Sequence, residues 1–215
     1  MKRELILGLI VAAGTVLFAQ EDRPLSPPGS TSAQVLGQWV KPDRRVSTMT
    51  GEAYQGGKWI DITYSRPIKR GRDAFGEGPT YGKVTNAGAP VWRAGANVTT
   101  RLKTEVPLLV GGKPMPAGEY SLFIELTKPT EWTLIVSTWP AQPGPHYDPT
   151  NKAALWGAFG YTPDKDVARA AMKVDALPFT VEELTWQFLN MTNDAGTIAL
   201  MWDRSMGSVA FTVGR

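Results

Sequence analysis

The chain has no cysteine and a single histidine among its 215 residues. Without cysteine it has no disulfides, no thiolate metal ligands and no thiol to carry a lipid anchor. His146 alone supplies too few ligands for a histidine-based zinc site, so we expect neither a metal nor a cofactor. The Gly-x-Ser-x-Gly nucleophile elbow is missing, and so is a phosphate-binding glycine loop that ends in Lys and Ser or Thr. These absences argue against metalloenzymes, α/β-hydrolases and P-loop nucleotide-binding proteins.

Strong charge and long apolar runs are also scarce. The formal net charge is +3 at pH 7, which is too small for general nucleic-acid binding. Beyond Phe18, no apolar run approaches the roughly 20 residues that a membrane-spanning helix needs. We therefore expect no nucleic-acid partner and no stable membrane insertion of the mature chain, whereas its oligomeric state stays open.

The first residues follow the pattern of a secretory signal peptide. Lys2 and Arg3 form a charged start, an apolar run extends over residues 5–18, and Ala19 is a small residue suited to cleavage. The run is short for a membrane anchor, although an uncleaved anchor is the alternative. We predict a signal peptide over residues 1–19 and export to the periplasm or the cell exterior.

The segment that follows is rich in proline. Residues 20–32 are polar and contain Pro24, Pro27 and Pro28, which predicts a flexible leader. Beyond it, no linker and no repeat of fixed period divides the chain. Residues 33–215 are therefore predicted to form one domain.

Alternating apolar and polar residues dominate that domain. The alternation is clearest in four segments, which are 119–126, 131–138, 182–189 and 197–202. Together with weaker segments and the turn residues between them, they predict about nine or ten short strands. No strand–helix–strand spacing is present. The fold class expected is all-β, an antiparallel β-sandwich of jelly-roll type with long loops and at most one short helix.

Three segments need a separate decision. Residues 167–174 have helical propensity but alternate in polarity, so we predict a strand there. Residues 152–159 are the candidate for the short helix. Residues 203–207 are predicted to form a turn between two strands.

The connection between two of these strands is long and cationic, and it contains most of the candidate binding residues. Arginine binds carboxylate or phosphate with a planar fork, aromatic rings stack on a ring or a sugar face, and asparagine both donates and accepts hydrogen bonds. The side chains predicted to form a ligand site are Tyr64, Arg66, Arg70, Arg72, Tyr81, Trp92, Arg93 and Asn97. Because Arg66 follows one strand and Arg93 precedes another, we also expect these two to approach each other around an anion.

Three functions remain open for this region. The first is an exported, non-enzymatic domain that binds a small polar, anionic or carbohydrate-like ligand, or a partner protein. The second is a hydrolase acting on a glycan or an ester, which needs two carboxylates near the arginines. Sequence spacing cannot pair the candidates, which are Asp61, Asp73, Glu119, Glu125, Glu182 and Asp203. The third is a structural envelope protein, in which the arginines bond to loop carbonyls and internal carboxylates.

An ordered set of motifs resembles a known family. The motifs are Tyr64-Ser65-Arg66-Pro67, Lys69-Arg70-Gly71-Arg72, Phe75-Gly76, Tyr81-Gly82-Lys83, Trp92-Arg93-Ala94-Gly95-Ala96-Asn97, Thr99-Thr100, Pro116 to Phe123 and Glu131-Trp132-Thr133. Their combination is similar to an uncharacterised exported bacterial family, domain of unknown function 2911. Residues 84–91 lengthen the connection between the Tyr-Gly and Trp-Arg motifs relative to that family. The resemblance implies one exported domain and no particular chemistry.

Overall fold

The computed structural model describes residues 24–41, 51–144 and 146–214. The predicted signal peptide, 1–19, lies outside these residues, as does the beginning of the expected leader. Within the described ranges, no helix is both long enough and apolar enough to cross a membrane.

Strands account for most of the described chain. They are β1 (Pro28–Val35), β2 (Gln38–Val40), β3 (Ala53–Gln55), β4 (Lys58–Ser65), β5 (Thr100–Thr104), β6 (Leu108–Val110), β7 (Lys113–Met115), β8 (Gly118–Lys128), β9 (Glu131–Ser137), β10 (Asp166–Leu189) and β11 (Ala195–Val213). The helical elements are the four-residue helix α1 (Lys83–Asn86) and the 3-10 turns η1 (Gly78–Thr80) and η2 (Pro163–Lys165).

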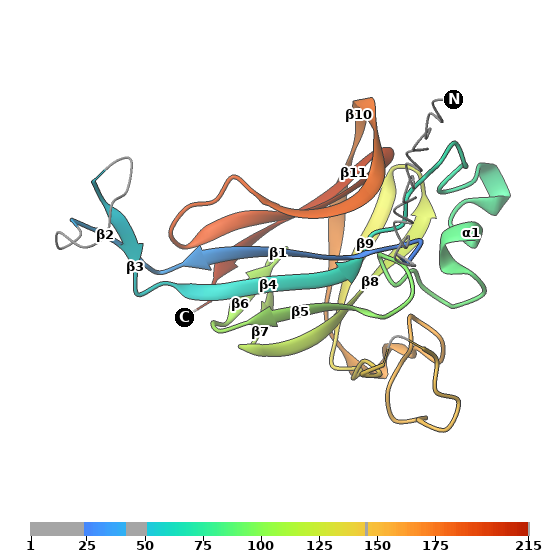
Figure 1. The fold of residues 1–215 in the computed structure, drawn as a ribbon, viewed down its shortest axis with the longest axis horizontal. Helices are drawn as coiled ribbons and strands as arrows, with labels where there is room; N and C mark the ends of the chain where they lie inside the picture. The colour runs from blue at the N-terminus through green and yellow to red at the C-terminus, as the bar shows by residue number, and fades with distance from the viewer. Residues whose placement is uncertain (1–23, 42–50, 145, 215) are drawn as a thin grey trace, which may run out of the picture.

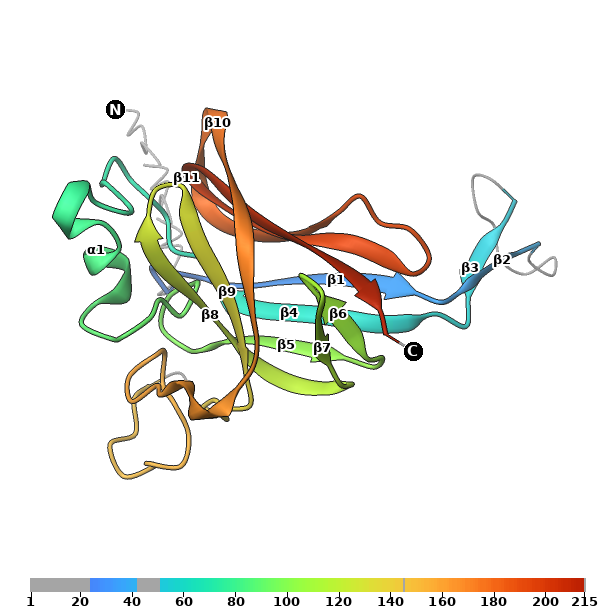
Figure 2. The same cartoon turned by 180° about the vertical axis from the view of Figure 1, so that it is seen from behind.

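The large sheet is antiparallel and folds over to make two layers. Its strand order is β1-β4-β5-β8-β9-β10-β11-β6-β7, and β2 and β3 form a separate hairpin. β10 pairs with β9 through residues 166–172 and with β11 through residues 173–189, so this one strand passes from the first layer to the second. The result is the predicted all-β sandwich. The β2–β3 hairpin projects from one end, and the two longest loops lie at the other (Figures 1 and 2).

The alternation predicted from the sequence places side chains on both faces of the first layer. Leu122 and Ile124 of β8 enter the main core between the layers, where both are fully buried. Phe123 points to the opposite face and is buried in a second, smaller core. Burial on both faces explains why β8 and β9 are more uniformly apolar than the half-exposed strands of the sandwich.

The second core is covered by residues 138–144 and 146–165, which we call the covering loop (Figure 1, gold, lower right). Leu155 and Tyr161 of this loop pack against Phe123. The Tyr161 hydroxyl donates to Asp166 Oδ2 over 2.7 Å, and Arg169 bonds the same oxygen over 2.9 Å. Burial and the Asp166 carboxylate raise the pKa of the Tyr161 hydroxyl well above its ordinary value. These contacts fix the covering loop to the sheet.

Three predictions about local structure were wrong. β1 begins at Pro28, so residues 28–32 pair with β4 and are not part of a flexible leader. Residues 152–159 form turns and bends, because Gly157 has a left-handed φ of +67° that interrupts a helix. The helix lies instead at α1, within the lengthened connection.

The third correction concerns the turn predicted at residues 203–207. These residues belong to β11, and Ser205 to Gly207 pair with residues 174–176 of β10. Asp203 does have the left-handed φ of a turn residue, 54°. It pairs with Val181 between two shifts in register, at which the additional residues belong to β10, so β11 continues through Asp203 as one long strand. The predicted pairs of short strands are therefore the two continuous strands β10 and β11.

Candidate ligand-binding site

The cationic connection, residues 66–99, leaves β4 at Ser65 and returns to the sheet at Thr100; we call it the site loop. Its two ends are bonded together. Ala96 N donates to Ser65 O over 3.3 Å, and Thr100 Oγ1 donates to Ala94 O over 3.2 Å. A Cβ at Gly95 would lie 3.0 Å from Ser65 O, so glycine permits this close approach.

Two tryptophans connect the base of the site loop to the main core. Trp92 is 1% exposed, and its backbone pairs with Ile124 of β8. Trp186 of β10 is fully buried, and its Nε1 donates to Ala94 O over 2.9 Å. Ala94 itself has a left-handed φ of 51°, which non-glycine residues rarely adopt. The two hydrogen bonds to its carbonyl hold it in that conformation.

The covering loop meets the site loop at Thr99. The Thr99 hydroxyl lies 3.0 Å from Leu155 O and 2.8 Å from Gly157 O. A Cβ at Gly157 would lie 2.6 Å from Arg93 Nη1. The absence of a side chain at Gly157 therefore makes room for the Arg93 guanidinium, and residues about 60 positions apart build one site.

A cavity of about 300 Å³ lies between the two loops; we call it the loop cavity. This volume is at the lower end of the range for small-molecule sites. It is lined by Pro67, Lys69, Arg72, Asp73, Ala74, Val84, Thr85, Trp92, Arg93, Gly95, Ala96, Asn97, Trp156 and Trp202.

Arg93 is the distinctive group of this cavity. Its Nη1 donates to Asn97 O over 2.6 Å, and its Cζ lies 5.2 Å from the centroid of the Trp156 ring and 5.6 Å from that of Phe159. Among the residues that the structure describes, no carboxylate oxygen lies within the 4.0 Å of a salt bridge to Arg93. Burial lowers the pKa of the Arg93 guanidinium. Its partners are thus a carbonyl and two rings.

The other charged groups of the loop cavity have internal partners. Lys69 Nζ lies 3.2 Å from Asp203 Oδ1, and both side chains are mostly buried. Arg72 donates from Nη2 to Ile68 O over 2.6 Å and from Nε to Lys69 O over 3.0 Å. Asp73 Oδ1 accepts from the backbone amides that follow it, which shapes the turn. These groups hold the site loop in place.

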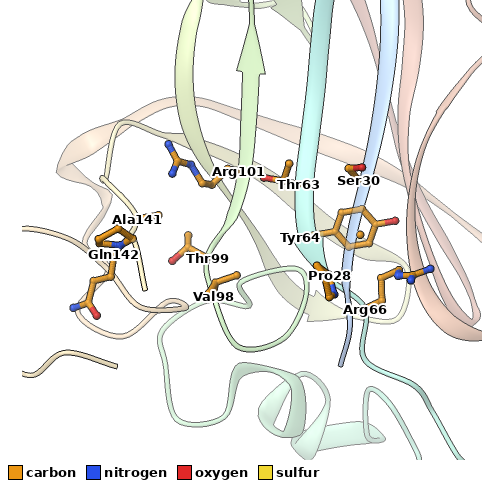
Figure 3. A pocket seen from close by; sticks show the side chains of 12 residues that line it. Pro28, Ser30, Thr63, Tyr64, Arg66, Val98, Thr99, Arg101, Ala141 and Gln142 are labelled. Carbon is orange, nitrogen blue, oxygen red and sulfur yellow. The ribbon is translucent and has the colours of Figure 1, made fainter. Parts of the chain in front are cut away.

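A second cavity, of about 700 Å³, is lined in part by Val98 and Thr99 at the end of the site loop; we call it the outer groove (Figure 3). Tyr64 and Arg66 line it, with Arg101 of β5 and Gln142 of the covering loop. The side chains of Arg66 and Arg101 lie apart in the groove, on either side of Thr63 and Tyr64 (Figure 3). Arg66 pairs with Glu183 of β10 over 3.0 Å, and Arg101 pairs with Glu119 of β8. Burial raises the pKa of the Tyr64 hydroxyl.

The structure divides the eight predicted site residues into three groups. Arg72, Trp92, Arg93 and Asn97 line the loop cavity, and Tyr64 and Arg66 line the outer groove. Arg70 and Tyr81 line neither: Arg70 is exposed, and the Tyr81 hydroxyl accepts from Trp132 Nε1 over 2.7 Å. Arg66 and Arg93, which we expected around one anion, line different cavities.

Sequence reasoning missed two aromatic walls of the loop cavity, Trp156 and Trp202. Trp156 lies in the segment expected to be a helix, and Trp202 in a strand where the alternation indicated only core packing. The Trp202 ring does stack on the core residue Trp92, with ring centroids 6.0 Å apart. The only signal for Trp156 was its position beside a glycine in a loop, which is weak.

Catalytic and metal-binding arrangements are sparse in the part of the chain that the structure describes. No three His, Asp or Glu side chains gather there in a way that could hold a metal ion. Asp73 is the one carboxylate among the described lining residues of the loop cavity, and the described lining of the outer groove contains none. The loop cavity has room for a small, flat anion. Its charged group would contact Arg93, and its flat face would lie against one of the indole rings of the lining.

Comparisons with known proteins identify a family but no activity. The model of a protein family described as "Protein of unknown function (DUF2911)" matches residues 46–211. No curated protein and no solved structure matches the chain significantly. The matched range includes every residue that lines the loop cavity.

Proposed function

The chain belongs to the DUF2911 family, whose description assigns no ligand or reaction, and from the geometry of the loop cavity we propose that it binds a small organic carboxylate there. Arg93 carries the proposal. Its guanidinium is half-buried beside Trp156, and no carboxylate of the described chain pairs with it. A charge removed from water costs free energy that a bound anion offsets.

The remaining polar groups favour a carboxylate over a phosphate dianion. Lys69 pairs with Asp203, and Arg72 is exposed to solvent and donates to two loop carbonyls, so Arg93 is the half-buried cation of the lining that no carboxylate of the described chain neutralises. Asp73 adds a negative charge to the lining, and it repels a dianion more than a monoanion. A guanidinium with one edge committed to Asn97 O still offers N–H groups for a carboxylate.

The cavity supports binding better than hydrolysis or a purely structural role. Hydrolysis of a glycan by a pair of carboxylates needs two of them about 5 to 10 Å apart, and Asp73 stands alone among the described lining residues. A structural role for every arginine fits Arg66, which pairs with Glu183, and Arg72. Arg93 fits such a role only in part, because Asn97 O accepts from one N–H of its guanidinium while no carboxylate of the described chain neutralises its charge.

Titration calorimetry with benzoate and with glucuronate tests the proposal, with quenching of tryptophan fluorescence as a second readout because Trp156 and Trp202 line the cavity. At least one of the two acids is expected to bind saturably. Arg93→Gln should weaken that binding about tenfold or more, the effect of losing a hydrogen bond to a charged group. Arg70→Gln is the matched control: it removes the same charge from an exposed position outside both cavities.

The stability of Arg93→Gln separates a ligand partner from an internal one. Loss of the contacts with the two rings destabilises the fold, whereas removal of a partly buried charge stabilises it. The two effects oppose each other, so the free energy of unfolding should change by no more than about 1 kcal/mol. No saturable binding of either acid, or equal binding by Arg93→Gln, would show the proposal to be wrong.

A further inference from the structure

We propose that the carboxylate belongs to the acidic sugar at the end of a glycan, and that the next sugars lie on an aromatic surface beside the cavity. This surface, which we call the aromatic ledge, consists of Tyr147, Trp156 and Phe159 of the covering loop. The inference rests on the proposed function and adds the class of ligand and a second contact region.

The ledge is continuous with the loop cavity. Trp156 lines the cavity and lies in the middle of the row: its ring centroid is 6.3 Å from that of Tyr147 and 6.5 Å from that of Phe159. The planes of Trp156 and Phe159 are inclined by only 9°. Tyr147 is 52% exposed and Phe159 is 40% exposed. A ligand that fills the cavity and continues outward therefore meets aromatic rings.

A sugar fits this combination of surfaces. One face of a pyranose ring presents C–H groups and packs on an aromatic ring, while its hydroxyls need donors and acceptors at the rim. The lining includes the Asn97 amide, which donates and accepts, and the Thr85 hydroxyl, which donates to Gly82 O and can still accept. Its volume of about 300 Å³ suits one ring, so further sugars of a chain have to lie outside, where the ledge is.

Charge distinguishes the ledge from the other exposed aromatic residues. Single exposed apolar side chains are normal on protein surfaces. Trp39 of β2, 66% exposed, packs on Tyr54 of β3 and borders a cavity of about 470 Å³. No cationic side chain is among the described residues that line that cavity, so this lining offers no partner for an acidic ligand. At the ledge, the Arg93 guanidinium lies against two of the three rings.

Three sugars test the inference: glucuronate, the β-1,4-linked trisaccharide of glucuronate followed by two glucose residues, and neutral cellotriose. Each is titrated into the protein under the same conditions. The acidic trisaccharide should bind about tenfold more tightly than glucuronate, the effect of about one further aromatic contact. Cellotriose should bind at least tenfold more weakly than the acidic trisaccharide, because it has no group for Arg93.

Variants of the ledge complete the test. Tyr147→Ala should lower the affinity for the acidic trisaccharide about tenfold, and Tyr147→Phe should retain it because the ring is kept. Trp39→Ala, at the far exposed aromatic pair, should leave that affinity unchanged. Tyr147 is exposed, so its replacement leaves the core intact.

The outcomes separate the two proposals. If glucuronate binds through Arg93 but the trisaccharide binds no better, or Tyr147→Ala binds it as the wild type does, the ledge plays no part. If benzoate binds and both acidic sugars do not, the ligand is not a glycan. If cellotriose binds as tightly as the acidic trisaccharide, the proposal that the terminal sugar is acidic is wrong. Failure of every carboxylate to bind overturns the proposed function as well.

Discussion

Trp186 connects the core of the sandwich to the binding site, and replacing it should affect both. Its side chain is fully buried in the main core, and its Nε1 donates to Ala94 O at the base of the site loop. Trp186→Ala leaves a cavity of several heavy atoms, which costs about 3–5 kcal/mol of unfolding free energy. Trp186→Phe retains most of the packing and loses the hydrogen bond. The Ala94 carbonyl then keeps only the bond from Thr100 Oγ1, so this change should cost about 1–3 kcal/mol.

Equilibrium unfolding in urea measures both costs, with equal slopes required for a direct comparison of midpoints. Ligand affinity provides the second readout. Because Ala94 has a left-handed backbone that its two carbonyl hydrogen bonds hold, Trp186→Phe should also weaken binding at the adjacent Arg93. The effect on affinity distinguishes a support for the site loop from a residue that only fills the core.

Trp39→Ala is the matched control, because Trp39 is 66% exposed and its loss should change stability by no more than about 0.5 kcal/mol. The reasoning is refuted if Trp186→Ala is as well tolerated as Trp39→Ala. A stable Trp186→Phe with unchanged affinity would leave the burial of Trp186 intact and refute its role in holding the site loop.

Two further predictions concern the covering loop and export. Gly157→Ala should weaken ligand binding several-fold, because the new Cβ would lie 2.6 Å from Arg93 Nη1. Gly160 is the control: it has the same left-handed backbone, but a Cβ there would have its nearest contact at 3.6 Å. Gly160→Ala should therefore lower stability without changing the affinity for the ligand. Comparable affinity losses in the two variants, measured by calorimetry, would contradict this account of Gly157. We also propose that the protein is exported and cleaved after Ala19, which the intact mass of the protein from the producing cell checks. A full-length chain retained in the membrane would rule this out.

The all-β fold and the existence of a cationic, aromatic loop could be predicted from the sequence because both depend on local patterns. The alternation in residues 119–126 and 131–138 predicts strands with one apolar face, and β8 and β9 form there, although Phe123 and Ile135 on the opposite face are buried as well. Arg93 and Asn97 stood out as candidates because arginine and asparagine bind polar ligands wherever a loop presents them. Family membership likewise follows from ordered motifs along the chain.

Which candidates line the loop cavity, which line the outer groove and which line neither depends on contacts between distant segments. Only the tertiary structure shows these contacts. Arg66 pairs with Glu183, 117 positions away, because the beginning of the site loop lies beside β10, where Ile68 forms a bridge with Glu183. Arg93 has no such partner in the described chain, because the segment facing it carries Gly157 and Trp156 instead of an acid. The continuity of β10 across both layers, and the position of the covering loop over the site, follow from strand order. A sequence pattern determines which face of a strand is apolar, while the partner across that face is selected by the packing of the whole sheet.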